Sequence, residues 1–403
     1  MSILSFIKKD KEELALLIDI GSGLVSSSLV LFSKNQLPKI LFITKSVFPI
    51  SEDGPNNLLK SMETGLNIVL KNTLKEGIQN SKNKKIHKVL ATFSSPWFYT
   101  LSKSLKVEEK EPFYVTSKSL KNLADTEAAQ FKSDTLKTLP ENAKDSLIIL
   151  ESSVVNTRMN GYPVNNVLGK KTKSLEADIW LSLIPESVEK KVLGLIQKHT
   201  HISKEHVLAH SFPLVLFSVI RDSFLVQESF VTMDITSETT HISFVCGDII
   251  KDVATMPIGR SYIVRQIAKR AEVGMEIAES YLRLYTDYKL DTVTTELIDL
   301  VVGDIEKEWA IYLEDALLTF SPKGAVPKTI FITGEKDINK IFLNFLAMEK
   351  KDKTQNWRNG LKLVEVDTQA LEHLYIDAYP KEKDIFVGIE TVFYDKKIKL
   401  KEL

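Results

Sequence analysis

Two copies of one short pattern constrain the fold of this chain more than any other feature. Residues 14–32 read LALLIDIGSGLVSSSLVLF, and residues 229–245 read SFVTMDITSETTHISFV. In each copy an apolar strand pattern reaches an aspartate, and a turn of small or hydroxylated residues leads into a second strand pattern. Asp19 and Asp234 occupy the same place in the two copies. Because repeated units dictate architecture, we expect two related halves.

Apolar periodicity predicts strands and helices along the rest of the chain. Strand patterns lie at 38–48, 87–93, 146–158, 175–184 and 384–394. Helix patterns lie at 55–79, 116–131, 186–200, 211–222, 261–270, 274–285 and 294–320, and a strand–turn–helix lies at 328–346. No Pro/Gly-rich linker divides the halves, so we expect an α/β protein whose subdomains pack against each other.

The composition excludes several classes of protein. With 53 basic and 53 acidic residues the formal net charge is zero, so the chain lacks the electrostatic signature of nucleic-acid binding. It contains no run of about 18 apolar residues, and we expect no segment that spans a bilayer. The one cysteine, Cys246, lies in an apolar run, which predicts a buried structural thiol and suits a reducing cytoplasm.

The first repeated loop has the residue types that a phosphate chain requires. Gly21 and Gly23 allow close approach of the backbone, Ser22 offers a hydroxyl, and Asp19 is placed to hold Mg²⁺ through water. An ordinary hairpin uses the same residues, and for a lone loop we would favour the hairpin. The second loop, which follows Asp234, changes that balance, because two facing loops can clamp one phosphate chain from both sides.

The order of these loops resembles the actin-like ATPase superfamily. IDIGSGLVSSSLV is similar to its phosphate-1 loop, MDITSETTHIS to its phosphate-2 loop, and IFITGEK to its adenosine loop. Within the superfamily the chain looks most like the FtsA/PilM branch of bacterial adaptors, which inserts a small SHS2-type subdomain called 1C. Residues 89–128 and 147–184 carry that part of the resemblance.

The resemblance implies a fold and a division of the chain. The fold is α/β, actin-like (ribonuclease H-like) and two-lobed, with an inserted SHS2-type subdomain. The expected division is a first lobe at 1–85, the inserted subdomain at 86–170, a return to the first lobe at 171–227, a second lobe at 228–383 and a closing strand of the first lobe at 384–403.

The resemblance also implies a nucleotide site for ATP and Mg²⁺. Its cofactor-binding residues would be Asp19, Gly21, Ser22, Gly23, Asp234, Thr236, Thr239, Thr240 and Gly334. Asp19 and Asp234 would hold the metal through water.

Several positions depart from the family pattern. Ser26 stands where the family has Lys or Arg, Thr236-Ser237 replace a Gly pair, Glu238 adds negative charge, and Glu335 replaces a second Gly. Side chains at the loop crowd a phosphate, and a carboxylate repels it. Together these changes predict weak nucleotide binding and little hydrolysis, so the chain is at most a weak ATPase and more a degenerate nucleotide-binding scaffold.

A cluster of aromatic residues at Trp97, Phe98 and Tyr99 has two interpretations. It either packs the core of the inserted subdomain, which we favour, or forms a peptide-docking surface for partners.

The function implied by the resemblance is a scaffold of a bacterial membrane-associated machine, located in the cytoplasm at the inner face of the membrane. Such adaptors bind cytoplasmic peptide tails of membrane proteins and can polymerise. The start, MSILSFIKKDKEE, is interpreted as a tail rather than a short membrane anchor, so membrane contact is at most peripheral.

Three functions are compatible with this resemblance. We favour PilM-like type IV pilus assembly, because the sequence ends at FYDKKIKLKEL without the C-terminal amphipathic helix of FtsA-type proteins. The second is an FtsA-like cell-division adaptor that tethers filaments to the membrane. The third, an ATP-dependent kinase or ATPase, is disfavoured, because it needs intact phosphate loops and a substrate site.

Overall fold

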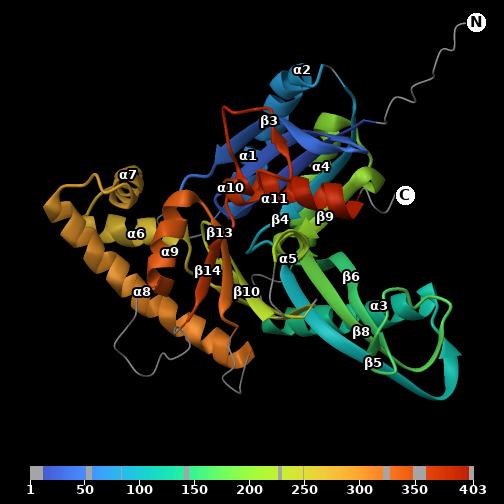
Figure 1. Ribbon diagram of the computed structural model, residues 1–403. Helices are drawn as coiled ribbons and strands as arrows, with labels where there is room; N and C mark the ends of the chain where they lie inside the picture. Colours follow the sequence, from blue (N-terminus) through green and yellow to red (C-terminus); the bar gives the residue numbers. More distant parts are fainter. Residues whose placement is uncertain are drawn as a thin grey trace, which may run out of the picture.

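The computed structural model describes residues 12–50, 57–82, 84–139, 145–225, 229–247, 249–320, 327–347 and 360–398. The expected N-terminal tail, residues 1–11, and the last five residues lie outside these ranges. The described chain forms two lobes and a third, smaller unit that extends away from them (Figure 1). None of its helices combines the length and the apolar character needed to cross a bilayer.

The first lobe is built on a six-stranded mixed sheet with the order β15-β3-β2-β1-β4-β9. Its strands are β1 Glu13–Ile20, β2 Leu24–Ser33, β3 Gln36–Val47, β4 Ile86–Phe93, β9 Val207–Ser211 and β15 Ile376–Asp377. Its helices are α1 Leu58–Asn72, α2 Ile78–Asn80, α4 Glu186–Thr200, α5 Phe212–Ser223, α10 Thr368–Leu371 and α11 Ile385–Phe393. Short π-helical segments follow α1 at Thr73–Gly77 and α11 at Tyr394–Ile398, and a 3-10 turn precedes β9 at Lys204–His206.

The second lobe repeats the same sheet pattern with five strands in the order β12-β11-β10-β13-β14. These are β10 Ser229–Ile235, β11 Thr240–Cys246, β12 Ile249–Met256, β13 Thr329–Gly334 and β14 Lys362–Glu365, accompanied by α6 Arg260–Ala271, α7 Met275–Thr286, α8 Thr292–Phe320 and α9 Lys336–Ala347. In both lobes a meander of three antiparallel strands continues into two parallel ones. The expectation of two related halves is therefore confirmed.

The third unit is a four-stranded sheet with the order β5-β8-β6-β7, covered by α3 (Ser117–Thr138). Its strands are β5 Tyr99–Tyr114, β6 Leu147–Met159, β7 Tyr162–Pro163 and β8 Lys171–Pro185. Thr116 caps α3, because its hydroxyl accepts from the Ser119 amide at 3.0 Å. We call this unit, residues 99–185, the inserted unit.

The boundaries of the inserted unit differ from those expected at 86 and 170. The strand that begins at Ile86 lies in the first-lobe sheet, where it pairs in parallel with β1. At the other end, β8 runs on to Pro185 while it still pairs with β5 and β6. Strand patterns alone do not reveal which sheet a strand joins, so the bounds at 99 and 185 follow from strand pairing.

The inserted unit is fastened to both lobes. The buried Glu151 carboxylate of β6 accepts from the Trp180 indole at 2.9 Å and from the Ser211 amide of β9 at 3.1 Å. On the side of the second lobe, the Ser102 hydroxyl donates to the carbonyl of Ile250 in β12. These bonds fix the inserted unit below the junction of the lobes (Figure 1).

The segment 384–394, expected as a closing strand, is the helix α11. Asp384 caps it, since its carboxylate accepts from the amides of Phe386 at 2.8 Å and Val387 at 3.3 Å. Residues 386–393 are all buried, so the apolar run has no polar face, and periodicity cannot separate such a helix from a buried strand. The strand prediction was wrong for that reason.

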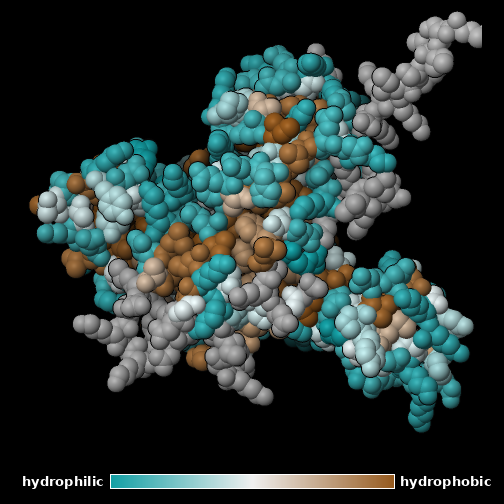
Figure 2. Space-filling model, viewed as in Figure 1, coloured by the Kyte–Doolittle hydropathy of each residue, from teal (hydrophilic) through white to brown (hydrophobic). Residues whose placement is uncertain are grey.

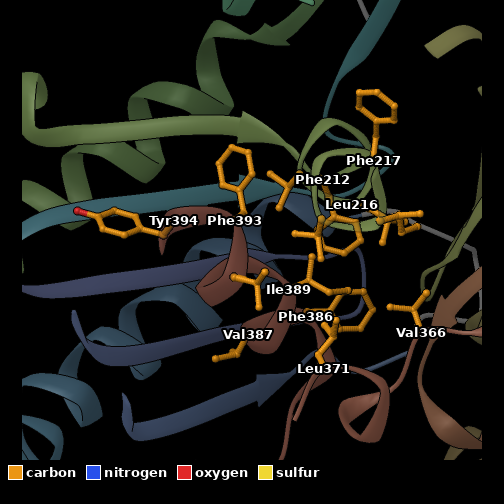
Figure 3. Close-up of a cluster of buried hydrophobic side chains, with 14 of the residues drawn as sticks. Phe212, Leu216, Phe217, Val366, Leu371, Phe386, Val387, Ile389, Phe393 and Tyr394 are labelled. Atoms are coloured by element: carbon orange, nitrogen blue, oxygen red, sulfur yellow. The ribbon is translucent and has the colours of Figure 1, made fainter. Parts of the chain in front are cut away.

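Helices α5 and α11 pack against each other at the centre of the molecule. The rings of Phe212 and Phe386 lie 5.2 Å apart, and Figure 3 shows them among side chains from both lobes, including Val366 and Leu371. Figure 2 likewise shows hydrophobic residues toward the middle of the visible face and hydrophilic ones over the tip of the inserted unit. One hydrophobic cluster therefore runs from the first sheet to the second and joins the lobes.

Cys246 is exposed at the end of β11, so the prediction of a buried thiol was wrong. It is the last residue of its strand, just before the positive-φ Gly247, and the apolar run around it continues only on the other side of the turn.

Candidate functional site

The first repeated loop is a tight hairpin between β1 and β2. The Gly21 amide donates to the Leu24 carbonyl at 3.0 Å, which closes the turn. The Trp97 indole donates to the Gly21 carbonyl at 2.8 Å from the opposite side. Asp19, opposite Ser26 in the ladder, ends the strand with a buried carboxyl. The loop is thus held from both sides.

The second repeated loop joins β10 to β11 and is fixed by its own hydroxyl groups. The Thr236 amide donates to the Thr239 carbonyl at 2.9 Å, and the Thr239 amide donates back to the Thr236 hydroxyl at 3.3 Å. Gly259 lies directly behind, where an added Cβ would come within 2.5 Å of the Thr236 carbonyl oxygen. Asp234 occupies the place in β10 that Asp19 occupies in β1.

The two loops contact each other directly. The Ser22 hydroxyl donates to the Thr236 hydroxyl at 3.0 Å and accepts from the Glu238 amide at 3.0 Å. The side chain of Ser237 fills the space beside Gly23, where an added Cβ would lie only 1.8 Å from the Ser237 Oγ. The groups that would cradle a phosphate therefore bind one another.

The cavity between the loops is correspondingly small. Its volume is about 20 Å³, and a water molecule alone needs about 10–15 Å³ on the same measure. It is lined by Asp19, Gly21, Ser22, Gly23, Leu24, Ser94, Ile235, Thr236, Ser237, Arg260, Glu335, Ile338 and Phe386. A second hollow of about 310 Å³ lies beside it, between the end of β3 and helices α6 and α7.

Both aspartates of the repeat are buried without a full set of partners. Asp19 Oδ1 and both oxygens of Asp234 have no hydrogen-bond partner among the described residues. Burial raises the pKa of Asp234 to about 8. Burial, and then the charges of Asp384 and Asp234, raise the pKa of Asp19 well above its ordinary value. In this arrangement the two carboxyl groups favour the protonated form.

Further acids gather around Asp19. Glu390 of α11 is buried, and burial followed by the charge of Asp19 raises its pKa. Lys45 of β3 forms an ion pair with Asp384 at 3.1 Å, which places a positive charge beside these acids. Carboxyl groups therefore crowd around Asp19, and burial together with their mutual repulsion favours the protonated form of Asp19 and Glu390.

The charged residues that replace family motifs are engaged elsewhere. Glu238 forms a two-pronged ion pair with Arg265 at 2.8 and 3.1 Å, so its charge is turned away from the loops. Arg260 contacts Glu279 at 2.8 Å, Asp337 at 3.2 Å and Glu335 at 3.5 Å. Because acids surround this guanidinium, it is not free to bind a phosphate.

The residues present do not fit Mg·ATP while the loops are closed. Two carboxyl groups and a serine hydroxyl are chemically suitable for a hydrated divalent ion, but the raised pKa values of Asp19 and Asp234 favour their protonated forms, which bind a cation poorly. A cavity of about 20 Å³ excludes a triphosphate. Nucleotide would enter only if the contact between Ser22, Gly23 and the second loop opened.

The structure brings most of the predicted cofactor-binding residues together. Asp19, Gly21, Ser22, Gly23 and Thr236 line the small cavity. The remaining four lie around it and do not line it: Asp234, Thr239, Thr240 and Gly334.

Two of these residues make contacts within their own lobe. The Thr240 hydroxyl donates to the Ile258 carbonyl at 2.7 Å, so it holds the segment between β12 and α6. Gly334 lies opposite Ile235 in the ladder, and an added Cβ would come within 2.6 Å of the Asn339 Oδ1, which indicates a role in packing.

The docking surface considered at Trp97, Phe98 and Tyr99 is not a surface. Trp97 and Phe98 are buried: Trp97 supports the first loop, and the ring of Phe98 lies 5.7 Å from His241. Tyr99 is half-buried at the start of β5. Trp97 and Phe98 therefore pack near the two repeated loops, whereas Tyr99 belongs to the sheet of the inserted unit.

Lys45, Asp384 and Phe386 were not recognised from the sequence as parts of the site. The sequence does contain a signal for Asp384, because an aspartate before an apolar run is typical of a helix cap. The interpretation of that run as a strand concealed the signal.

Comparison with known proteins identifies the fold. No protein-family model and no curated protein matches the sequence. The structure is similar to the solved PilM–PilN type IV pilus biogenesis complex, with a TM-score of 0.59, 14% identity, and coverage of 96% of this chain and 98% of the other.

Two further solved structures also match. One is a Bacteroides thetaiotaomicron protein with an actin-like ATPase fold (TM-score 0.46, 10% identity, 97% and 99% covered). The other is the ethanolamine utilization protein EutJ from Carboxydothermus hydrogenoformans (0.43, 10%, 95% and 90%). The likeness to the PilM–PilN structure spans nearly the whole of both chains, and the chain has the predicted actin-like, two-lobed α/β fold.

Proposed function

We propose that this chain is an actin-like scaffold in a machine of the type IV pilus class, with a role like that of PilM. The proposal draws on the likeness to the PilM–PilN structure over 96% of this chain. In that structure PilM is paired with PilN, so the partner we propose is a cytoplasmic peptide segment of a PilN-like membrane protein. The scaffold would act in the cytoplasm, at the inner face of the membrane.

One observation carries the choice of a scaffold over an ATPase. The Ser22 hydroxyl and the space beside Gly23 are used for contact with Thr236, Ser237 and Glu238. An ATPase keeps this gap open for phosphates, whereas a scaffold is served by a closed gap that locks one lobe against the other. ATP and Mg²⁺ are accordingly weak conformational ligands in this proposal, bound only when the lobes separate.

The inserted unit is the proposed counterpart of the SHS2-type subdomain, and its exposed edge is a candidate for contacts within a polymer. Partner binding and self-polymerisation both use surfaces, and neither requires turnover of nucleotide.

The nucleotide part of the proposal is tested by titrating Mg·ATP into the full chain by calorimetry. The wild type should show no binding at millimolar ATP, and the Ser237→Gly variant, which empties the space beside Gly23, should show measurable binding. Adding Asp19→Asn to that variant should remove it. Tight binding by the wild type that depends on Asp19 would overturn the proposal.

The partner part is tested with a synthetic peptide that spans the cytoplasmic segment of the PilN-like protein from the same organism. Fluorescence anisotropy should give a micromolar dissociation constant, and a scrambled peptide of equal charge should not bind. Equal binding of both peptides, or of neither, would contradict a PilM-like role.

A further inference from the structure

Helix α8 carries an exposed apolar line on the face that points away from its own core. Val293, Leu300, Ile311 and Leu318 are 58–77% exposed. Their spacings of seven and eleven residues are close to whole numbers of helical turns, so the four side chains lie within about 20° of one line. We call these four residues the α8 stripe. Figure 1 shows α8 along the outer edge of the second lobe.

The α8 stripe is symmetric about the middle of the helix, between Ile305 and Glu306. Leu300 lies five residues before Ile305, and Ile311 lies five residues after Glu306. In the same way, Val293 lies twelve residues before Ile305, and Leu318 lies twelve residues after Glu306. A helix with this spacing is its own complement when a second copy runs antiparallel, since Leu300 then meets Ile311 and Val293 meets Leu318.

The charges at the centre have the same symmetry. Asp304 and Lys307 lie next to the midpoint on either side of the stripe, about 60° apart around the helix. Both side chains are more than 70% exposed, and they form a pair at 3.0 Å within the helix. In an antiparallel pair of copies Asp304 faces Lys307 twice. In a parallel pair each charge faces its like, which is unfavourable.

We propose that α8 pairs antiparallel with α8 of a second copy of this chain and forms a closed two-fold dimer. Such an interface is isologous, because the same patch serves both partners. It differs from head-to-tail polymerisation, which joins two different surfaces and leaves ends open. The proposal does not depend on the pilus role, and it concerns a different face of the molecule from the nucleotide cleft.

The second copy fits this face better than a partner of another kind. A basic amphipathic helix would satisfy the acids beside the stripe, Glu296 and Asp315, but it gives no reason for symmetric spacing. Two copies bring these acids near each other, which weakens the pairing. We therefore expect a micromolar dimer, best measured at about 0.15 M salt, where the Debye length is about 8 Å.

The test is sedimentation equilibrium of the full chain over a range of concentrations. The wild type should pass from monomer to dimer, and Leu300→Asp or Ile311→Asp should raise the dissociation constant about 100-fold or more, because each substitution is repeated across the axis. The control is Leu37→Asp, which changes an exposed apolar side chain on β3 of the first lobe and should leave the dimer unchanged. Circular dichroism confirms that each variant is folded.

A charge exchange tests the antiparallel register. Asp304→Lys alone and Lys307→Asp alone should each weaken the dimer about tenfold, and the double variant should restore it. A chain that stays monomeric at all concentrations overturns the proposal. So does a dimer that withstands Leu300→Asp, or a double variant that remains as weak as the single ones.

Discussion

At the scale of single residues, Asp234 should govern how stability depends on pH. Burial raises its pKa from 3.8 to about 8, so between these values the folded chain keeps a proton that the unfolded chain releases. Its contribution to stability is complete below about pH 4 and is lost as the pH rises toward 8. Asp234→Asn should remove that loss and stabilise the protein at pH 8 by a few kcal/mol, measured by thermal unfolding across pH.

The matched control is Asp252→Asn, an exposed aspartate on the neighbouring strand β12. It should leave the slope of stability against pH unchanged. Parallel curves for the wild type and Asp234→Asn would mean that Asp234 is charged and partnered in the folded protein, and would contradict a buried, protonated carboxyl at this position.

Gly23 should be irreplaceable only while Ser237 faces it. A Cβ at this position would lie 1.8 Å from the Ser237 Oγ and 2.3 Å from its Cβ, so Gly23→Ala must push the loops apart. We expect a loss of about 1–3 kcal/mol in urea unfolding, as for overpacking in general. In the Ser237→Gly background the loss should largely vanish, which a double-mutant cycle measures.

Gly194→Ala in α4 serves as the control for Gly23, because nothing lies near its added Cβ and alanine favours a helix. It should be neutral or stabilising. A Gly23→Ala cost that does not change with Ser237 would show that the loops do not touch in solution.

The sequence predicts where most site residues lie, but it does not predict that the two loops contact each other. Asp19, Gly21 and Thr236 were found because the repeat marks them, and the altered residues Ser237 and Glu238 lie at the contact between the two loops. The closure itself depends on contacts between residues more than 200 positions apart, such as Ser22 with Thr236, which local patterns do not contain.

At the scale of elements, strands and amphipathic helices were predictable because alternation and 3.6-residue spacing are local. The meander at residues 13–47 and the capped helix α3 agree with expectation. Helix α11 does not, since burial on all sides erases the pattern. The expected closing strand of the first lobe is instead a helix that packs against α5.

Asp384 should be the most sensitive position of α11. Its carboxylate caps two amides and pairs with Lys45 at 3.1 Å, so Asp384→Ala loses the cap and leaves a half-buried cation short of a partner. We expect a loss of about 2–4 kcal/mol in chemical denaturation. Asp384→Asn keeps the cap and should lose clearly less. Equal losses for the two variants would argue against a capping role.

At the scale of the whole molecule, the repeat predicted the two lobes, and the sheets do follow one strand order twice. The division into units was less predictable, because β4 and β8 are assigned by pairing partners distant in sequence. The hydrophobic cluster around α5 and α11 then joins the lobes (Figure 3). The contact between Ser22 and Thr236 closes the gap between the two loops.

The most direct test of a closed cleft is phosphate release from ATP by the full chain, followed with and without Mg²⁺ and compared with an Asp19→Asn/Asp234→Asn double variant. If the cleft is closed, the wild type should release no more phosphate than the double variant at any Mg²⁺ concentration. Mg²⁺-dependent release by the wild type that disappears in the double variant would contradict a closed cleft and show that the loops open to hydrolyse ATP.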